Sequence, residues 1–81
     1  MKIRVLLFAL ARQLAAAEFM DVELSEQPTV GELRRQLAEA CPALAQLSAH
    51  ALFAVNAEYA ADSAAIPANA EVACIPPVSG G

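Results

Sequence analysis

The sequence predicts an α+β fold in which one main helix covers a mixed β-sheet. Three observations support this: apolar residues alternate in short runs towards both ends, one longer stretch has helical spacing, and 81 residues suit one domain. The predicted order is strand, strand, helix, strand, strand. Because one helix can cover one face of a small sheet, we expect residues 1–81 to form a single domain.

The N-terminal part of the chain is predicted to form two strands. Apolar side chains alternate with other residues over 2–8, which is typical of a strand with one buried face. Residues 9–15 are consistent with a short helical turn or a loop. A second alternation covers residues 20–24, where Asp21 and Glu23 give the strand one polar face.

The main helix is predicted to begin after Thr29. Thr29 and Glu32 form a capping box, in which each side chain can satisfy a free amide at the helix start. Apolar residues then recur at helical spacing: Val30, Leu33, Leu37 and Cys41. Pro42 ends this helix and can open a second short turn that runs through Leu47.

Two further strands are predicted in the C-terminal half. Residues 52–55 are apolar and are followed by the turn-forming Asn56, whereas residues 58–70 look irregular. The last strand covers residues 71–75, and Pro76-Pro77 ends it because proline has no amide hydrogen for a sheet. If the first and last strands are central neighbours, the fold is β-grasp, the ubiquitin architecture; the residue spacing does not determine this pairing.

Charge and hydropathy argue against two classes of partner. The net charge is −4 and the only adjacent basic pair is Arg34-Arg35, so we expect no nucleic-acid binding. The longest apolar run, Val5–Ala11, has seven residues, whereas a membrane span needs roughly 20. The hydrophobic fraction of 58% is high mainly because 20 residues are alanine, so we expect no membrane insertion.

The cysteines favour a cytoplasmic location. Small secreted domains usually carry more cysteines than Cys41 and Cys74, so we expect two free thiols in a reducing compartment. The alternative is secretion, because residues 1–19 resemble a signal peptide. Arg12 interrupts that apolar stretch, however, and cleavage after Ala17 would remove the first predicted strand.

The sequence shows no self-contained active site. The single histidine, His50, lies between two alanines, and two distant cysteines do not have the spacing of zinc ligands. Gly31 is isolated, so there is no glycine-rich phosphate-binding loop. We therefore expect no bound metal or cofactor and no enzymatic activity of the chain on its own.

The last six residues are the most informative segment. They are Pro76, Pro77, Val78, Ser79, Gly80 and Gly81. The prolines favour a stiff, extended start, six residues reach about 20 Å, and the glycines can enter a channel too narrow for a β-carbon. We expect this flexible tail to be functional and the α-carboxylate of Gly81 to react after activation by a partner. The alternative interpretation is that the terminal Gly-Gly has no role.

Four segments resemble the small subunit of molybdopterin synthase. They are "IRVLLFALAR" at 3–12, "TVGELRRQL" at 29–37, "FAVNAEYA" at 53–60 followed by Asp62, and "EVACIPPVSGG" at 71–81. The resemblance covers nearly the whole chain, and the ending at 76–81 is its most specific part. One departure is Asn69-Ala70-Glu71, where the family usually has Gly-Asp-Glu; asparagine tolerates a left-handed turn, so we expect the turn to form.

The resemblance implies a β-grasp fold and a sulfur-carrier function. A ubiquitin-activating-like adenylyltransferase would consume ATP to adenylate Gly81, which is then converted to a thiocarboxylate. The sulfur would pass to cyclic pyranopterin monophosphate inside the large subunit and form the dithiolene of molybdopterin. The family also implies a heterotetramer of two small and two large subunits.

The strand pattern predicts a docking patch beside the tail. If the first and last strands are parallel neighbours, their outer faces bring together Leu6, Phe8, Ala73 and Ile75. An apolar patch with a charged rim is typical of a docking surface, and we expect it to bind both the large subunit and the activating enzyme. The alternative is that a small loop covers these residues.

Two other functions use the same tail. The chain could be a ubiquitin-like modifier attached through Gly81 to lysines of other proteins, or a sulfur carrier for another pathway such as thiamin synthesis. Lys2 is the only lysine, which disfavours the building of modifier chains but not a single attachment.

Overall fold

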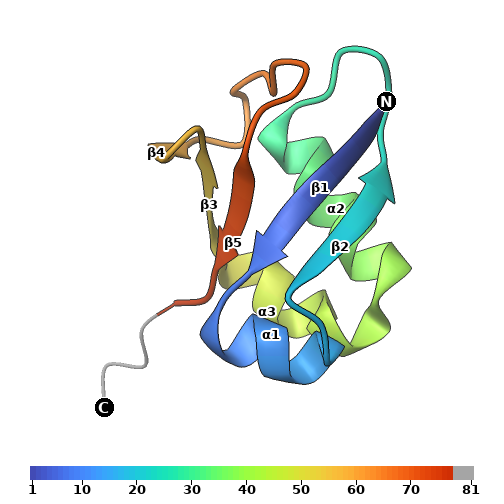
Figure 1. The fold of residues 1–81 in the computed structure, drawn as a ribbon, viewed down its shortest axis with the longest axis vertical. Helices are drawn as coiled ribbons and strands as arrows, with labels where there is room; N and C mark the ends of the chain where they lie inside the picture. The colour runs from blue at the N-terminus through green and yellow to red at the C-terminus, as the bar shows by residue number, and fades with distance from the viewer. Residues whose placement is uncertain (78–81) are drawn as a thin grey trace.

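The computed structural model describes residues 1–77, which form a five-stranded sheet with helices packed against one face (Figure 1). The elements in chain order are β1 (Lys2–Leu7), α1 (Ala9–Ala15), β2 (Phe19–Glu23), α2 (Val30–Ala40), the 3-10 helix η1 (Pro42–Leu44), α3 (Ala45–His50), β3 (Leu52–Val55), β4 (Glu58–Ala60) and β5 (Val72–Ile75). The strand order is β2-β1-β5-β3-β4, and β1 and β5 are parallel neighbours near the centre. This pairing confirms the predicted β-grasp fold.

The core lies between the sheet and α2. Alternate residues of β1 and β5 point to this side, and both Val5 and Val72 are fully buried. They pack with the apolar stripe of α2, in which Val30, Leu33 and Leu37 are also fully buried. Because the two central strands bury one face here, their other residues face away from the helices.

The start of α2 differs in one detail from the predicted capping box. The Thr29 hydroxyl accepts a hydrogen bond from the Glu32 amide at 3.2 Å, as expected. The Glu32 carboxylate instead accepts bonds from the amide and the hydroxyl of Ser25, each at 2.7 Å. These bonds lower the pKa of Glu32 and fasten the loop that leads into the helix.

Gly31 in the first turn of α2 permits a close approach of the chain near residue 62. Its amide donates to the Asp62 carbonyl at 2.9 Å. A β-carbon at position 31 would lie 3.3 Å from the same carbonyl oxygen, which is tighter than ordinary packing. This is the structural reason for the isolated glycine.

Several elements differ from the sequence-based expectation. Of the two expectations for residues 9–15, the helical one is correct: α1 begins at Ala9 (φ 49°) and is followed by Ala16 (φ 55°), both in the left-handed region. The segment expected to be irregular contains β4, which forms a hairpin with β3. Cys41, expected on the buried stripe, is half-buried because the helix ends there. The expected left-handed turn is present at Asn69 (φ 62°).

Within residues 1–77, no helix has the length and apolar character needed to cross a membrane.

Candidate functional site

The tail leaves the sheet from one of its most firmly held strands. β5 pairs in parallel with β1 and antiparallel with β3, so both of its edges are hydrogen-bonded. Its Val72 and Cys74 side chains are fully buried. Pro76, directly after the strand, is half-buried, and Pro77 is exposed. The position and direction from which the tail starts are therefore fixed by the core.

The remaining tail residues lie outside the described part of the chain. The predictions for Val78, Ser79, Gly80 and Gly81 concern these residues. The structure describes only residues 1–77, from which they extend and which we call the platform.

The predicted docking patch is assembled as expected. Leu6 of β1 lies directly opposite Ala73 of β5, so the two side chains share the outer face of the sheet. Phe8 continues β1 with an extended backbone and is 46% exposed, while Leu6, Ala73 and Ile75 are half-buried. The exposure of Phe8 disagrees with the alternative that a loop covers the whole patch.

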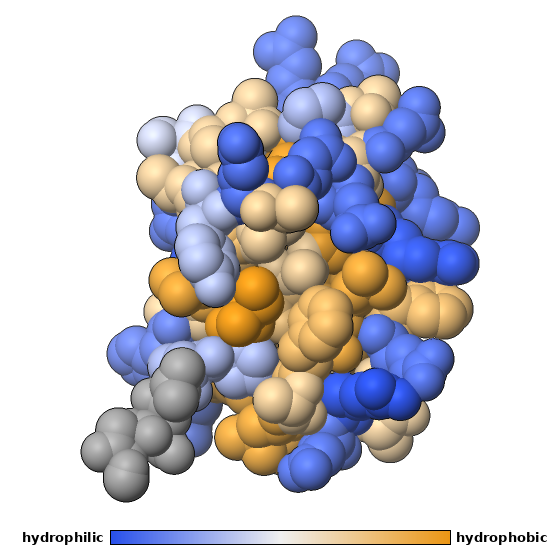
Figure 2. Space-filling model, turned by 60° about the vertical axis from the view of Figure 1, so that its left-hand side comes forward, coloured by the Kyte–Doolittle hydropathy of each residue, from blue (hydrophilic) through white to orange (hydrophobic). Residues whose placement is uncertain are grey.

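The strand register adds three large side chains to this patch. Phe19 of β2 lies opposite Leu6, Leu52 of β3 opposite Ile75, and Tyr59 of β4 opposite Ala54. All three are well exposed. We call the full set the outer apolar face: Leu6, Phe8, Phe19, Leu52, Tyr59, Ala73 and Ile75. Figure 2 shows hydrophobic side chains gathered on this side of the molecule, with hydrophilic ones around them.

These three residues could not be assigned to the face from the sequence. Phe19 precedes the predicted strand 20–24, residues 52–55 are apolar without alternation, and Tyr59 lies in the segment expected to be irregular. Which side each strand turns outward also depends on its register with a neighbour. The strand pairing puts Phe19 beside Leu6 and Leu52 beside Ile75. It puts Tyr59 beside Ala54, which itself lies opposite Ala73.

A charged pair borders the outer apolar face. Arg4 Nε donates to Asp21 Oδ1 at 3.0 Å, and the Arg4 guanidinium lies 3.9 Å from the centre of the Phe19 ring. The hydrogen bond from Arg4 lowers the pKa of Asp21, so both groups stay charged at neutral pH. The pair therefore forms a polar rim and holds the aromatic ring in place.

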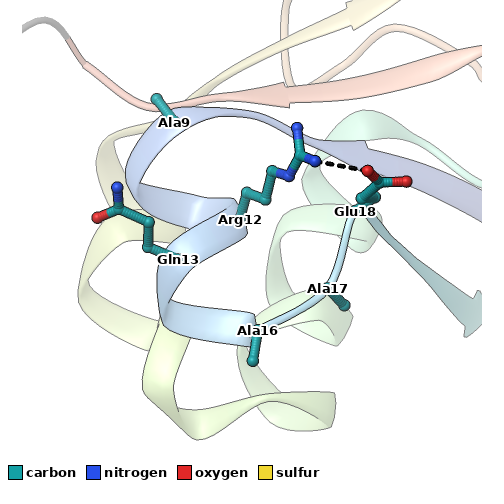
Figure 3. Close-up of a pocket in the computed structure, with 6 residues that line it drawn as sticks. All are labelled: Ala9, Arg12, Gln13, Ala16, Ala17 and Glu18. Carbon is teal, nitrogen blue, oxygen red and sulfur yellow. Dashed lines mark hydrogen bonds and ion pairs between the residues drawn. The ribbon is translucent and has the colours of Figure 1, made fainter.

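Besides the outer apolar face, the surface has a more polar depression beside α1, between this helix and Glu18 just before β2 (Figure 3). Arg12 and Glu18 form an ion pair across it, and small side chains such as Ala16 and Ala17 line the rest. The pairing of Arg12 with a carboxylate neutralises the cation that an anionic ligand would need. Among the described residues, this depression therefore offers no unpaired arginine to bind a phosphate group.

The cysteines and histidine do not form a reactive centre in the described residues. Burial raises the pKa of the Cys74 thiol to about 11, which suppresses its nucleophilic thiolate. Cys41 is half-buried and is also a free thiol. Residues 1–77 contain no cluster of three or more histidine, cysteine, aspartate or glutamate side chains that could hold a metal.

Comparison with known proteins identifies the family. The family model described as the ThiS family matches residues 5–81, which include most of the platform and the tail. The chain belongs to the ThiS family. Two curated relatives of this ThiS-family chain are named molybdopterin synthase sulfur carrier subunit. The protein from Chlamydomonas reinhardtii is 39% identical, with all of both chains covered, and that from Arabidopsis thaliana is 35% identical, covering 99% of this chain and 83% of its own.

A solved structure in another functional class is also similar to this ThiS-family chain. SAMP1 of Haloferax volcanii, the small archaeal modifier protein 1, superimposes with a TM-score of 0.84 and 32% sequence identity. The match covers 99% of each chain. Proteins named as sulfur carriers and a protein named as a modifier are therefore both similar to this chain over nearly its whole length.

Proposed function

We propose that this ThiS-family chain is a sulfur carrier in molybdenum cofactor biosynthesis and that Gly81 carries the sulfur. The names of the curated relatives support the pathway, and the match over the full chain includes the tail. The chain would act as the small, non-catalytic subunit of molybdopterin synthase. The observation that carries the proposal is the fixed start of a Gly-Gly tail next to an exposed apolar face.

The chemistry would begin with activation of the Gly81 carboxylate. A carboxylate oxygen attacks the α-phosphate of ATP in a partner adenylyltransferase, forming an acyl-adenylate and releasing pyrophosphate. A sulfur nucleophile at the oxidation level of hydrosulfide then attacks the carbonyl carbon. The carbon–sulfur bond forms as the bond to AMP breaks, which leaves a thiocarboxylate on Gly81.

The sulfur would then be transferred to cyclic pyranopterin monophosphate within the large subunit. The thiocarboxylate sulfur forms a bond to a side-chain carbon of the pterin precursor as the bond from that carbon to oxygen breaks, and the oxygen leaves as water or phosphate. Water then cleaves the acyl–sulfur bond, which leaves the sulfur on the pterin and regenerates the Gly81 carboxylate, and a second such transfer supplies the second sulfur of the dithiolene. The platform contributes by presenting the tail in one direction, because β5 is held on both edges. Glycines at 80 and 81 allow the reactive end to enter a narrow channel.

The outer apolar face would hold the partners during these steps. It combines large exposed side chains with a charged rim, and it lies on the strands from which the tail starts. Use of one face by both the activating enzyme and the large subunit would make their binding mutually exclusive. The carrier would therefore leave the activating enzyme before it delivers its sulfur.

The test is reconstitution with the activating enzyme, ATP and a sulfur source, followed by mass spectrometry of the last residue. A chain that ends at Gly80 is the matched control. The proposal requires ATP-dependent sulfur incorporation at Gly81 in the full chain and none in the control.

A second candidate is a protein modifier, favoured by the similarity to the small archaeal modifier protein 1. The same acyl-adenylate would react with a lysine amine instead of a sulfur nucleophile. An isopeptide bond between Gly81 and another protein in the native cells would support this function.

A further inference from the structure

The place at which β5 ends depends on its neighbour β3. Leu52, the first residue of β3, lies opposite Ile75, the last residue of β5. Pro76 and Pro77 have no amide hydrogen, so they cannot donate to a sheet ladder beyond Ile75. The direction in which the chain leaves the sheet is therefore set by the residues that flank this last pair.

The turn from α3 into β3 flanks both the last pair and the prolines. We call residues 47–52 the α3–β3 junction. Its Leu47 and His50 line an apolar groove between α1 and the η1–α3 segment. Pro76 and Pro77 line the same groove. The α3–β3 junction thus lies beside the end of β5 and beside the start of the tail.

Arg34 of α2 fixes the α3–β3 junction by two hydrogen bonds. Its Nη1 atom donates to the carbonyl oxygens of Ser48 and Ala51, both at 2.7 Å. The Ser48 hydroxyl donates in return to the carbonyl oxygen of Arg34 at 2.9 Å. The guanidinium also lies 4.9 Å from the centre of the Phe53 ring in β3. Because Ser48 and Ala51 are buried, carbonyls that lost Arg34 would have no ready donor from water.

These two bonds act as the C-terminal cap of α3. The helix ends at Ala51, whose backbone is extended (φ −70°, ψ 152°), so the chain turns directly into β3. The last carbonyls of a helix lack partners within the helix, and a cation is favourable at this end. Arg34 supplies both the donors and the positive charge from a different helix. The angle between α3 and β3 is therefore set by Arg34.

We infer that Arg34 is a positioning residue for the tail: by fixing the α3–β3 junction, it sets the direction in which Pro76 leaves the sheet. The inference rests on the proposed function, in which Gly81 must reach a reacting group in a partner. Gly81 follows Ile75 by six residues, so a small change of direction at Pro76 moves the reacting carboxylate much farther. A misplacement of about 1 Å can lower a rate about 100-fold.

The first test measures the start of the tail without any partner. Residual dipolar couplings of the Cα–Hα bonds of Ile75, Pro76 and Pro77 report their orientation relative to the rest of the sheet. We expect these couplings to change in Arg34→Met and to fit the wild-type orientation in Leu24→Ala. Leu24→Ala is the matched control, because it also destabilises the fold but lies at the other end of the sheet.

Two further variants separate the Arg34 bonds from a general loss of stability. Arg34→Lys keeps one nitrogen that can donate to both carbonyls, so we expect it to be close to wild type. Ser48→Ala removes only the reciprocal bond and is the milder variant if Arg34→Met does not fold. We expect the couplings at Pro76 to change in Ser48→Ala in the same direction, by a smaller amount.

The second test measures adenylation of each folded variant by the activating enzyme over a range of carrier concentrations. We expect Arg34→Met to lower kcat at least about tenfold while KM stays within about twofold, because the docking surface is unchanged. Arg34→Lys should recover most of kcat. A merely structural role would only reduce the concentration of folded carrier, which raises the apparent KM and leaves kcat as in wild type.

Three results would overturn the inference and leave the proposed function intact. They are wild-type couplings at Pro76 in the folded Arg34 and Ser48 variants, a wild-type kcat with only a raised KM in Arg34→Met, and an equal fall of kcat in Leu24→Ala. If the wild-type carrier is not adenylated at all, the proposed function itself fails. The dipolar couplings would then still decide whether Arg34 sets the direction of the tail.

Discussion

The Arg34 side chain makes several hydrogen bonds that link separate elements of the fold. Its Nη1 donates to the carbonyls of Ser48 and Ala51, both at 2.7 Å, and Nη2 donates to Asp62 at 2.9 Å. The guanidinium also lies 4.9 Å from the centre of the Phe53 ring. One side chain thus joins α2 to the end of α3, to β3 and to the loop near residue 62.

We predict that Arg34→Met destabilises the protein by about 2–3 kcal/mol, because two carbonyls lose a charged donor in a partly buried site. Arg35→Met is the matched control, since Arg35 is exposed, and its effect should stay within about 0.5 kcal/mol. Urea unfolding of both variants measures this difference. Equal unfolding midpoints would show that the Arg34 network contributes little to stability.

The two cysteines should differ in reactivity in the native protein. Cys74 is fully buried and its thiol pKa is raised from 9.0 to about 11, whereas Cys41 is half-buried. We predict that an alkylating reagent at pH 8 modifies Cys41 and spares Cys74. Peptide mass mapping gives the two rates.

The pH dependence of Cys74 alkylation follows from the raised pKa of its thiol. In the unfolded chain Cys74 ionises near 9.0, and in the folded chain it stays protonated until the pH approaches 11. Its alkylation should therefore stay slow through pH 9 and accelerate only above that, and denaturant should remove the protection. Rapid native labelling of Cys74 at pH 8 would contradict its burial.

At the scale of the elements, the sequence was sufficient where one pattern dominates. The alternation in β1 and β5 and the cap at Thr29 predicted both central strands and the start of α2. β4 was missed because it has three residues, all without a buried side chain, and obtains its conformation from pairing with β3.

The sequence predicts the range of α1, residues 9–15, but does not distinguish a helix from a loop there. Apolar residues continue from β1 into α1, so hydropathy does not mark where the strand ends. The break is the left-handed backbone at Ala9, a conformation that alanine rarely adopts and that no residue pattern indicates. The Glu32 contact with Ser25 was also unpredictable, because it depends on the path of the loop.

The outer apolar face of the sheet can be tested as a partner-binding surface. Phe8→Asp places a charge in the outer apolar face and should weaken binding to both the activating enzyme and the large subunit by at least about tenfold. The fold should remain, because Phe8 is exposed and occupies the N-cap of α1, where aspartate is favoured. Titration calorimetry with each partner measures the effect.

Glu26→Gln, at an exposed loop position, is the control that changes charge elsewhere. If Phe8→Asp and this control bound both partners with wild-type affinity, the outer apolar face would not be their docking site.

At the scale of the whole molecule, the apolar surfaces gather around the start of the tail. The outer apolar face adjoins the apolar groove between α1 and the η1–α3 segment at Phe8–Leu10 and at Ile75–Pro76. The ion pair of Arg4 with Asp21 lies farther along the strands, and the ribbon shows that β5 ends at the opposite end of the sheet from the N-terminus (Figure 1). The sequence predicted the four central patch residues, but not the groove, which requires α1 and α3 to come together.

This arrangement suits a chain that is acted on by other proteins. The sheet fixes the position of Pro76, at which the tail starts, and under the proposed function the apolar surfaces beside it would bind the proteins that supply the chemistry. A modifier would have the same arrangement, so the fate of Gly81 distinguishes the two functions.

The most direct measurement is therefore the intact mass of the carrier after incubation with the activating enzyme, ATP and a sulfur source. The sulfur-carrier function predicts a mass increase equal to the exchange of one oxygen for sulfur, located at Gly81, dependent on ATP and absent from the chain that ends at Gly80. An unchanged carboxylate at Gly81, or its appearance only in isopeptide linkage to lysine, would contradict the sulfur-carrier function.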